Sequence, residues 1–193
     1  MGIVRGFDRR KFLKRFYKEP PLQSFHGYMS SIARRVSTTR SRRSLRCYDA
    51  FLTHEWGSDG LSTHSIVSVL NTKLVEAGLT TWFDGERVSG NIAQQVSEGV
   101  QKSKKIIVCV TRRYMEKLQS NNADWCKDEF LAATRVHNGV ENMIPLVLEP
   151  EMLIANSWRG PLQLHLGGHL YIDFSTEEHR EANFQELLNR IRS

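Results

Sequence analysis

The feature that most constrains the fold is a short apolar run, Lys105–Thr111, near the middle of the chain. It reads Lys-Ile-Ile-Val-Cys-Val-Thr, and its five inner residues are apolar and mostly β-branched. Such a run is typical of a strand that protein covers on both faces, as in the middle of a parallel sheet. Similar runs at Tyr48–Thr53 and Met143–Leu148 are separated from it by segments with helical spacing. The sequence therefore predicts a parallel sheet whose strands are connected by helices.

This alternation continues from residue 48 to residue 193 and predicts one α/β domain. We expect a flavodoxin-like, doubly wound, five-stranded parallel sheet. In such sheets ligands bind where the loops after the strands converge, here the loops after Thr53, Phe83 and Thr111. The predicted strands are Tyr48–Thr53, Leu79–Phe83, Lys105–Thr111, Met143–Leu148 and Leu170–Phe174; the predicted helices lie around Ile66–Val75, Asn91–Ser103, Tyr114–Leu118, Trp125–His137 and Glu177–Ile191, with an irregular or helical connection at Pro150–Leu166.

Residues 1–47 form a basic extension in front of this domain. They hold 13 Lys and Arg residues against Asp8 and Glu19, a net charge of +11, whereas the rest of the chain has a net charge of −5. Within residues 1–19, apolar and aromatic residues fall on one side of a helix among basic ones, a pattern typical of binding to anionic membranes. A disordered tail, a linker with sites for basophilic kinases and an organelle transit peptide are the alternatives left open. The apolar and aromatic residues are Phe12, Leu13, Phe16 and Tyr17.

Composition argues against several other classes of protein. Three cysteines, Cys47, Cys109 and Cys126, are too few for a disulfide framework, which predicts reduced thiols and a cytoplasmic location. No stretch approaches the roughly 20 apolar residues that span a bilayer, so membrane contact is expected only at the periphery. No Walker loop or Gly-x-Gly-x-x-Gly is present, and two glycines between His165 and His169 disfavour a metal site. Nucleic acid is disfavoured as a partner because no aromatic platform accompanies the basic tail.

Five short motifs occur in order along the domain. They are Tyr48-Asp49-Ala50-Phe51-Leu52-Thr53-His54, Trp82-Phe83-Asp84 after Gly78, Gly90-Asn91-Ile92, Tyr114, and Trp125-Cys126-Lys127-Asp128-Glu129. Together they resemble the Toll/interleukin receptor (TIR) domain family, over about residues 47–193. That family contains signalling adaptors that bind only other TIR domains, and members that cleave NAD at the nicotinamide glycosidic bond. The motifs look like those of the NAD-cleaving type.

The resemblance implies a site at the carboxyl end of the sheet. In the cleaving members a Glu four residues after a Trp is catalytic, and here that residue is Glu129. Trp82 matches the position of an aromatic residue, which would stack on the cationic nicotinamide ring. The first loop often carries basic residues in the family, whereas this chain has Glu55 and Trp56, so phosphate contacts are not expected there. NAD is the expected substrate, and no bound cofactor is expected. The remaining predicted substrate contacts are Thr53, His54, Asp84, Arg87 and Trp125.

A single carboxylate is enough for this chemistry. Nicotinamide leaves NAD as a neutral ring, so no acid is needed, and the barrier lies in forming a cation on the ribose that a carboxylate can stabilise. From the residues alone, the spacing favours Glu129 as a solvated helix residue paired with Lys127 or Arg135, and Trp82 is as readily an ordinary core residue as a site residue.

Two functions follow from the resemblance. The first is an NAD⁺ nucleosidase of signalling or immunity that releases nicotinamide and ADP-ribose, or a cyclised form of it. Its activity would require self-association with other TIR domains through the loop that contains Gly85, Val88 and Gly90. The second is a non-catalytic signalling adaptor that uses the same loop for contacts between TIR domains. The enzyme needs Glu129, and the adaptor does not.

Overall fold

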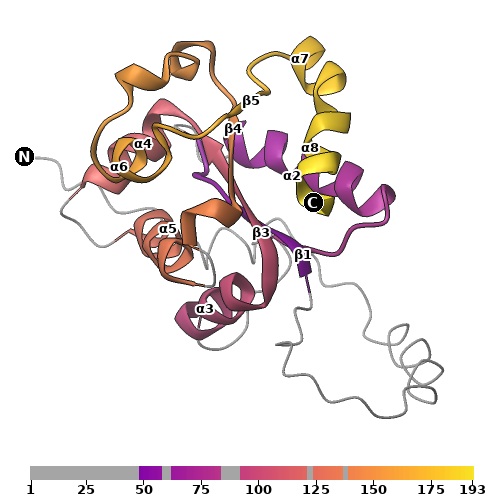
Figure 1. Cartoon of the computed structure of the whole chain (residues 1–193), viewed down its shortest axis with the longest axis horizontal. Helices are drawn as coiled ribbons and strands as arrows, with labels where there is room; N and C mark the ends of the chain where they lie inside the picture. Colours follow the sequence, from indigo (N-terminus) through magenta and orange to yellow (C-terminus); the bar gives the residue numbers. More distant parts are fainter. Residues whose placement is uncertain (1–47, 58–61, 84–91, 121–123, 137–138) are drawn as a thin grey trace, which may run out of the picture. The chain divides into compact units, whose positions relative to one another are not determined.

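The computed structural model describes residues 48–57, 62–83, 92–120, 124–136 and 139–193, apart from the side chains of residues 92–95 and 125. These residues belong to the second of two units of the chain, Ser44–Ser193. The predicted basic tail, residues 1–47, lies outside them, so its role stays a prediction. Figure 1 labels four of the strands, and the described part contains five in all. They are β1 (Tyr48–Thr53), β2 (Thr81–Trp82), β3 (Ser103–Val110), β4 (Met143–Val147) and β5 (Ile172–Asp173).

The five strands form one parallel sheet in the order β2-β1-β3-β4-β5. Both neighbours of β3 run parallel to it: Phe51 of β1 pairs with Ile106, and Leu146 of β4 pairs with Cys109. The predicted fold class is therefore confirmed, and the apolar run that begins at Lys105 is the central strand.

Helices cover the sheet on both faces. The 3₁₀ turns η2 (Gly139–Asn142), η3 (Pro150–Met152) and η4 (Ala155–Ser157) flank β4. None of the helices in the described part of the chain is both long and apolar enough to cross a membrane. The helices are α2 (Ser62–Glu76), α3 (Ile92–Lys102), α4 (Arg112–Gln119), α5 (Trp125–Arg135), α6 (Gly160–Leu166), α7 (Glu177–Ala182) and α8 (Phe184–Arg192).

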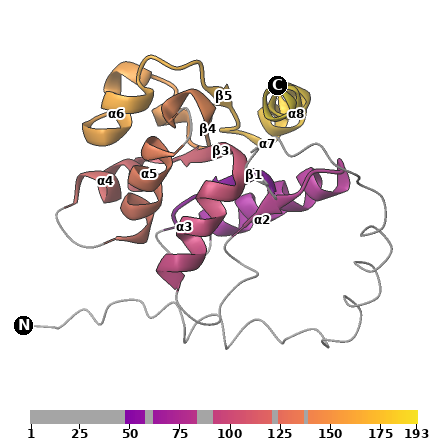
Figure 2. The ribbon, with the colours of Figure 1, turned by 60° about the horizontal axis from the view of Figure 1, so that its bottom comes forward.

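The central strand shows why its sequence is apolar throughout. Successive side chains of a strand point to opposite faces. Val108 accordingly packs in a cluster with residues of α3, α4, α5 and α6, whereas Ile107 and Cys109 pack with residues of α2 and α8. Figure 2 shows how these helices are arranged around the sheet. All three side chains are fully buried. Burying an Ile or Val side chain stabilises the fold by about 1.5–3 kcal/mol, so both faces contribute.

Several elements differ from their predicted extent, and β5, predicted over Leu170–Phe174, is confined to Ile172–Asp173. β2 is confined to Thr81–Trp82, and the single closing helix predicted over Glu177–Ile191 is two helices, α7 and α8. The break falls at Asn183, which has φ −97° and ψ 1°. The Asn183 side-chain amide donates a hydrogen bond of 2.8 Å to the carbonyl of Asp173, at the end of β5. This bond anchors Asn183 to the sheet at the point where α7 ends and α8 begins, and it favours the non-helical ψ of Asn183 there.

Candidate functional site at the carboxyl end of the sheet

Glu129 lies on the buried face of α5. The helix begins after Asp124, whose carboxylate accepts a hydrogen bond of 2.9 Å from the backbone N–H of Cys126. A carboxylate among apolar residues needs hydrogen-bond donors, because an unpaired buried charge is costly. Glu129 is 4% exposed, so the solvated role that spacing alone allows for it is wrong. The buried residues of this face recur at helical spacing and are Cys126, Glu129, Phe130 and Ala133.

A chain of hydroxyl groups reaches Glu129 from β1 and α4. The Thr53 hydroxyl donates a hydrogen bond of 2.9 Å to Oε2 of Glu129. The Tyr114 hydroxyl lies 3.0 Å from Oγ1 of Thr53. Since Thr53 has one hydroxyl proton and gives it to the carboxylate, Tyr114 donates to Thr53 when Glu129 is ionised. Burial, together with the nearby Cys126 and Glu129, raises the pKa of Tyr114 well above its usual value, so the phenol keeps this proton.

Tyr114 is held in place by the start of α4. Thr111 is the N-cap of this helix, and its side chain accepts a hydrogen bond of 3.0 Å from the backbone N–H of Tyr114. The start of α4 therefore fixes the Tyr114 phenol, the end of β1 supplies Thr53, and α5 supplies the carboxylate of Glu129. The site brings together elements that are far apart in the sequence, as the sheet topology predicts.

His54, predicted to contact substrate together with Thr53, lies on the other face of the sheet. Its Nε2 is 2.8 Å from Nδ1 of His64 in α2. The two imidazoles stack with the rings of Trp56 and Phe83, and the Trp56 and His64 rings are nearly parallel with centroids 4.0 Å apart. The structure therefore brings Thr53 and Glu129 together, and it places the His54 side chain against His64 of α2, Trp56 and Phe83 instead.

Glu55 is a further site residue, and no residue pattern indicated it. Its side chain is 1% exposed, accepts three hydrogen bonds and forms one ion pair. The Gly57 N–H donates at 2.6 Å, the Thr63 hydroxyl at 2.5 Å and the Thr111 hydroxyl at 3.3 Å, and Nε of Arg113 forms an ion pair at 3.3 Å. Glu55 therefore joins the end of β1 to the start of α2 and the start of α4.

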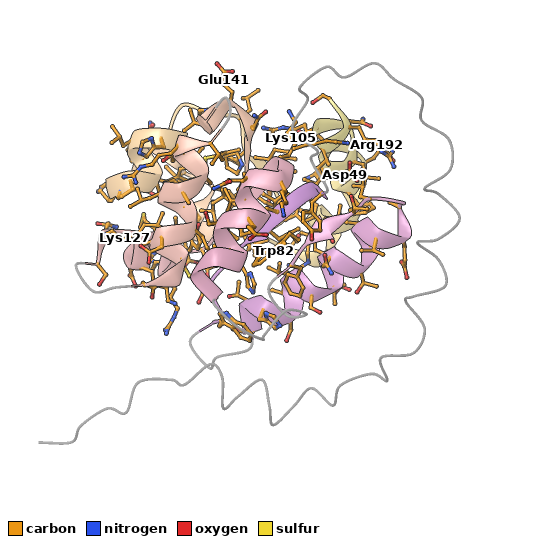
Figure 3. All side chains as sticks on the ribbon, turned by 90° about the horizontal axis from the view of Figure 1, so that it is seen from below. Asp49, Trp82, Lys105, Lys127, Glu141 and Arg192 are labelled. Atoms are coloured by element: carbon orange, nitrogen blue, oxygen red, sulfur yellow. The ribbon has the colours of Figure 1, made fainter. Side chains whose placement is uncertain are left out.

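Trp82 lies within the core. It is 3% exposed and stacks on Phe51, with ring centroids 4.5 Å apart. A Cβ atom added at Gly99 of α3 would lie 2.7 Å from the indole ring, so this helix also packs directly against it. Figure 3 shows Trp82 beside α3. Stacking on nicotinamide, the role implied by the resemblance, would require the ring to leave these contacts and stays a prediction.

The remaining predicted residues cannot be placed in the site. Trp125 is the first residue of α5, but its side chain is not described. The rest lie outside the described residues. They are the predicted substrate contacts Asp84 and Arg87 and the self-association residues Gly85, Val88 and Gly90.

The two buried thiols near the site are poor nucleophiles. Cys109 and Cys126 are free and buried. Burial raises the pKa of both thiols, and for Cys126 the nearby Glu129 carboxylate adds to this effect. Among the residues that the structure describes, no group of three His, Cys, Asp or Glu side chains is arranged to hold a metal ion.

Comparison with known families decides what this domain is. A sequence profile of the TIR domain matches residues 51–188, which is most of the chain. The chain belongs to the TIR domain family. The matched span runs from the second half of β1 into α8 and includes Thr53, Tyr114 and Glu129. No curated protein sequence matches the chain.

Solved structures agree with this assignment at the level of the fold. The TIR domain of the Toll-related receptor TRR-2 from Hydra magnipapillata is 17% identical, with a TM-score of 0.53 over 76% of this chain and 99% of that one. A metazoan TIR-STING receptor from C. gigas is 18% identical, with a TM-score of 0.54 over 81% of this chain and 44% of that one. The same receptor in complex with 2′,3′-cGAMP gives a TM-score of 0.53. This chain thus spans under half of the TIR-STING receptor.

Proposed function

We propose that this TIR domain cleaves NAD at the bond between nicotinamide and ribose, with Glu129 as the catalytic carboxylate. The observation that carries the proposal is the setting of Glu129 on the inner face of α5. One oxygen of its carboxylate is held by Thr53 at the carboxyl end of β1, where parallel sheets bind their ligands. An oriented carboxylate in a largely buried site stabilises positive charge more strongly than one in water.

The reaction needs only this group and water. The glycosidic C–N bond breaks, and its electron pair neutralises the cationic ring of nicotinamide as that ring leaves. The positive charge moves to the ribose, where Glu129 stabilises it until water adds to the anomeric carbon and loses a proton. Thr53 and Tyr114 act by positioning: the Thr53 hydroxyl holds Oε2 of Glu129, and the Tyr114 hydroxyl in turn holds Thr53. Attack by a group of the substrate in place of water would give a cyclised ADP-ribose.

The test is release of nicotinamide from NAD by the purified protein and by Glu129→Gln, which keeps the size and removes the charge. Loss of one preorganised electrostatic group lowers kcat by about 10²- to 10³-fold, and KM should change much less. Asp128→Asn is the matched control, because it removes a carboxylate from an exposed position next to Glu129 on the same helix. Equal turnover by the parent and Glu129→Gln would overturn the catalytic role.

Self-association is the second part of the proposal. The resemblance implies a site completed between TIR domains through the loop of Gly85, Val88 and Gly90. Specific activity should then rise with protein concentration, and a bulky residue in place of Gly90 should reduce assembly and turnover together. A constant specific activity across a wide dilution series would identify a self-sufficient monomer.

A non-catalytic adaptor is the second candidate function. The observation in its favour is that Glu129 is 4% exposed, since the bond to Thr53 would also serve simply to hold α5 against β1. For an adaptor, no nicotinamide would appear at any protein concentration, although the domain would still self-associate. Turnover that Asp128→Asn keeps and Glu129→Gln loses would exclude this alternative.

A further inference from the structure

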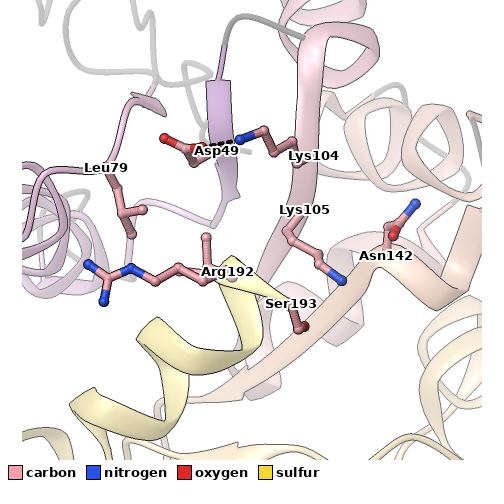
Figure 4. Close-up of a pocket in the computed structure, with 8 residues that line it drawn as sticks. Asp49, Leu79, Lys104, Lys105, Asn142, Arg192 and Ser193 are labelled. Carbon is pink, nitrogen blue, oxygen red and sulfur yellow. Dashed lines mark hydrogen bonds and ion pairs between the residues drawn. The ribbon is translucent and has the colours of Figure 1, made fainter. Parts of the chain in front are cut away.

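The diphosphate of NAD lies on the 5′ side of the ribose whose bond is cleaved, so a site for NAD also meets this anion. A cation that binds it has to lie at the carboxyl end of the sheet, near Glu129. Lys104 and Lys105 lie at the other end, where β3 begins, and Lys104 is paired there with Asp49 (Figure 4). The start of α4 directly follows the carboxyl end of β3, and it carries Arg113.

Arg113 is anchored by a buried carboxylate. Its Nε lies 3.3 Å from Oε2 of Glu55, and the side chains of the two residues are 48% and 1% exposed. Glu55 is itself held by hydrogen bonds from the Gly57 N–H and from the hydroxyl groups of Thr63 and Thr111. The ion pair therefore orients the guanidinium at the surface, with its Nε side on Glu55.

The rest of this guanidinium is available for a ligand. A guanidinium has five N–H donors in a planar fork. Among the residues that the structure describes, Glu55 is the one partner of the Arg113 side chain. The fork matches the geometry of phosphate oxygens. A guanidinium that a carboxylate already orients also loses less conformational entropy on binding than an unpaired side chain would lose.

Arg112, the preceding residue, pairs on the other side of the central strand. Its Nε lies 3.3 Å from Oε1 of Glu151, which follows β4. Glu55, the partner of Arg113, follows β1, and β1 and β4 lie on opposite sides of β3 in the sheet. The two arginines are therefore directed to different parts of the carboxyl end, and Arg113 is the one directed to β1.

The spacing along the end of β1 suits one ribose phosphate unit. Thr53 holds Glu129, and Glu55 holds Arg113. Thr53 and Glu55 are two residues apart, so their Cα atoms are separated by at most about 7 Å. In NAD the bond to be cleaved and the nearer phosphate group lie at opposite ends of one ribose, a separation of the same order. One strand end thus positions a carboxylate for the ribose and a guanidinium for the phosphate.

On the basis of the proposed cleavage of NAD, we propose that Arg113 binds the diphosphate of the substrate. It makes the site selective for nicotinamide ribosides that carry a phosphate group. Glu55 acts by positioning, because it orients Arg113 and does not itself contact the substrate. A cation from α4 thereby supplies the phosphate contact that the loop after β1, with Glu55 and Trp56, does not supply.

The test measures binding of ADP-ribose to the full chain by titration calorimetry. ADP-ribose carries the diphosphate but no nicotinamide, so the proposed cleavage does not consume it. Arg113→Gln should weaken binding by about tenfold or more, the effect of losing one charge-assisted hydrogen bond. Arg112→Gln is the matched control, since it removes the same charge from the adjacent residue, and its affinity should stay within about twofold of the parent.

Nicotinamide release separates this proposal from the proposed function. Arg113→Gln should raise KM for NAD by about tenfold and change kcat much less. Nicotinamide riboside, which has no phosphate group, should be cleaved at the same rate by Arg113→Gln and the parent. Binding of ADP-ribose through Arg113 without any cleavage of NAD would refute the proposed function and leave this proposal standing.

Arg113→Lys is a second variant in case Arg113→Gln does not fold. It keeps a cation beside Glu55 but loses the planar fork, so it should also weaken the binding of ADP-ribose. Unchanged affinity in Arg113→Gln, or in Arg113→Lys where only that variant folds, would overturn the proposal. An equal loss of affinity in Arg112→Gln and Arg113→Gln would overturn it as well. Either result would leave the role of Glu129 in NAD cleavage untouched.

Discussion

The hydrogen bond from Thr53 to Glu129 can be tested by removing one hydroxyl group. Thr53→Val keeps the shape of a fully buried side chain and deletes the donor to Oε2 of Glu129, together with the acceptor for Tyr114. A hydrogen bond to a buried charged group contributes about 1.5–3 kcal/mol. For a domain of this size 1 kcal/mol corresponds to about 2–4 °C, so the melting temperature should fall by about 3–12 °C.

A double-mutant cycle isolates this contact. In Glu129→Gln the same hydroxyl meets a neutral acceptor, for which a hydrogen bond contributes only about 0.5–1.5 kcal/mol. Thr53→Val should therefore cost about 1–1.5 kcal/mol less in the Glu129→Gln background than in the parent. Urea unfolding followed by circular dichroism gives the four free energies of unfolding, provided that the urea dependence is the same in all of them.

Two results would refute this reasoning. A coupling energy within about 0.5 kcal/mol of zero would mean that Thr53 and Glu129 do not interact. A melting temperature of Thr53→Val equal to that of the parent would mean that the hydroxyl is solvated or has another partner. Neither measurement depends on NAD cleavage, so both remain informative if the domain proves to be an adaptor.

Three further predictions concern other buried or paired groups. Glu55→Ala leaves several donors without an acceptor and should lower the free energy of unfolding by about 3–5 kcal/mol. Glu55→Gln should lower it clearly less. Equal decreases in the free energy of unfolding of the two variants, measured in urea, would contradict this prediction. Although burial opposes ionisation of Asp49, hydrogen bonds from Lys104 and Thr80 hold its pKa below the usual value, so its stabilisation is present above about pH 4 and is lost as the pH falls further. Asp49→Asn should accordingly be less stable than the parent at pH 7 and approach it at pH 3; a constant difference between the two would argue against the ion pair. The third prediction uses Cys47→Ser, which leaves Cys109 and Cys126 as the two thiols of the chain. Both should react with a thiol reagent at least about 10²-fold more slowly in the folded protein than in urea. Rapid labelling in buffer would show that their burial is incomplete.

The sheet was predictable because each strand carries its own signal. The unbroken apolar run from Ile106 onward requires cover on both faces, and the structure provides it through two separate clusters. The helix break at Asn183 was not predictable in the same way. It depends on a hydrogen bond to the end of β5, and no periodicity within the helix reports a contact of that kind.

The site was predictable only in part. The family motifs singled out Glu129, and alternation along an extended strand would also have placed Thr53 and His54 on opposite faces. Glu55 had no such signal: a Glu in a polar loop after a strand normally lies in solvent. Its burial depends on donors from α2 and from the start of α4, which only the folded chain brings together.

The strand order has a consequence for how the chain is made. β1 is synthesised first, yet it lies between β2 and β3, and Ala50 cannot pair with Lys105 until the third strand has been translated. At about 5–20 residues per second, the ribosome takes roughly 3–11 s to cover that distance. During this interval an apolar strand presents unpaired backbone groups to any neighbouring nascent chain. Slower elongation between α2 and β3 should therefore raise the yield of aggregates without altering the stability of the finished domain.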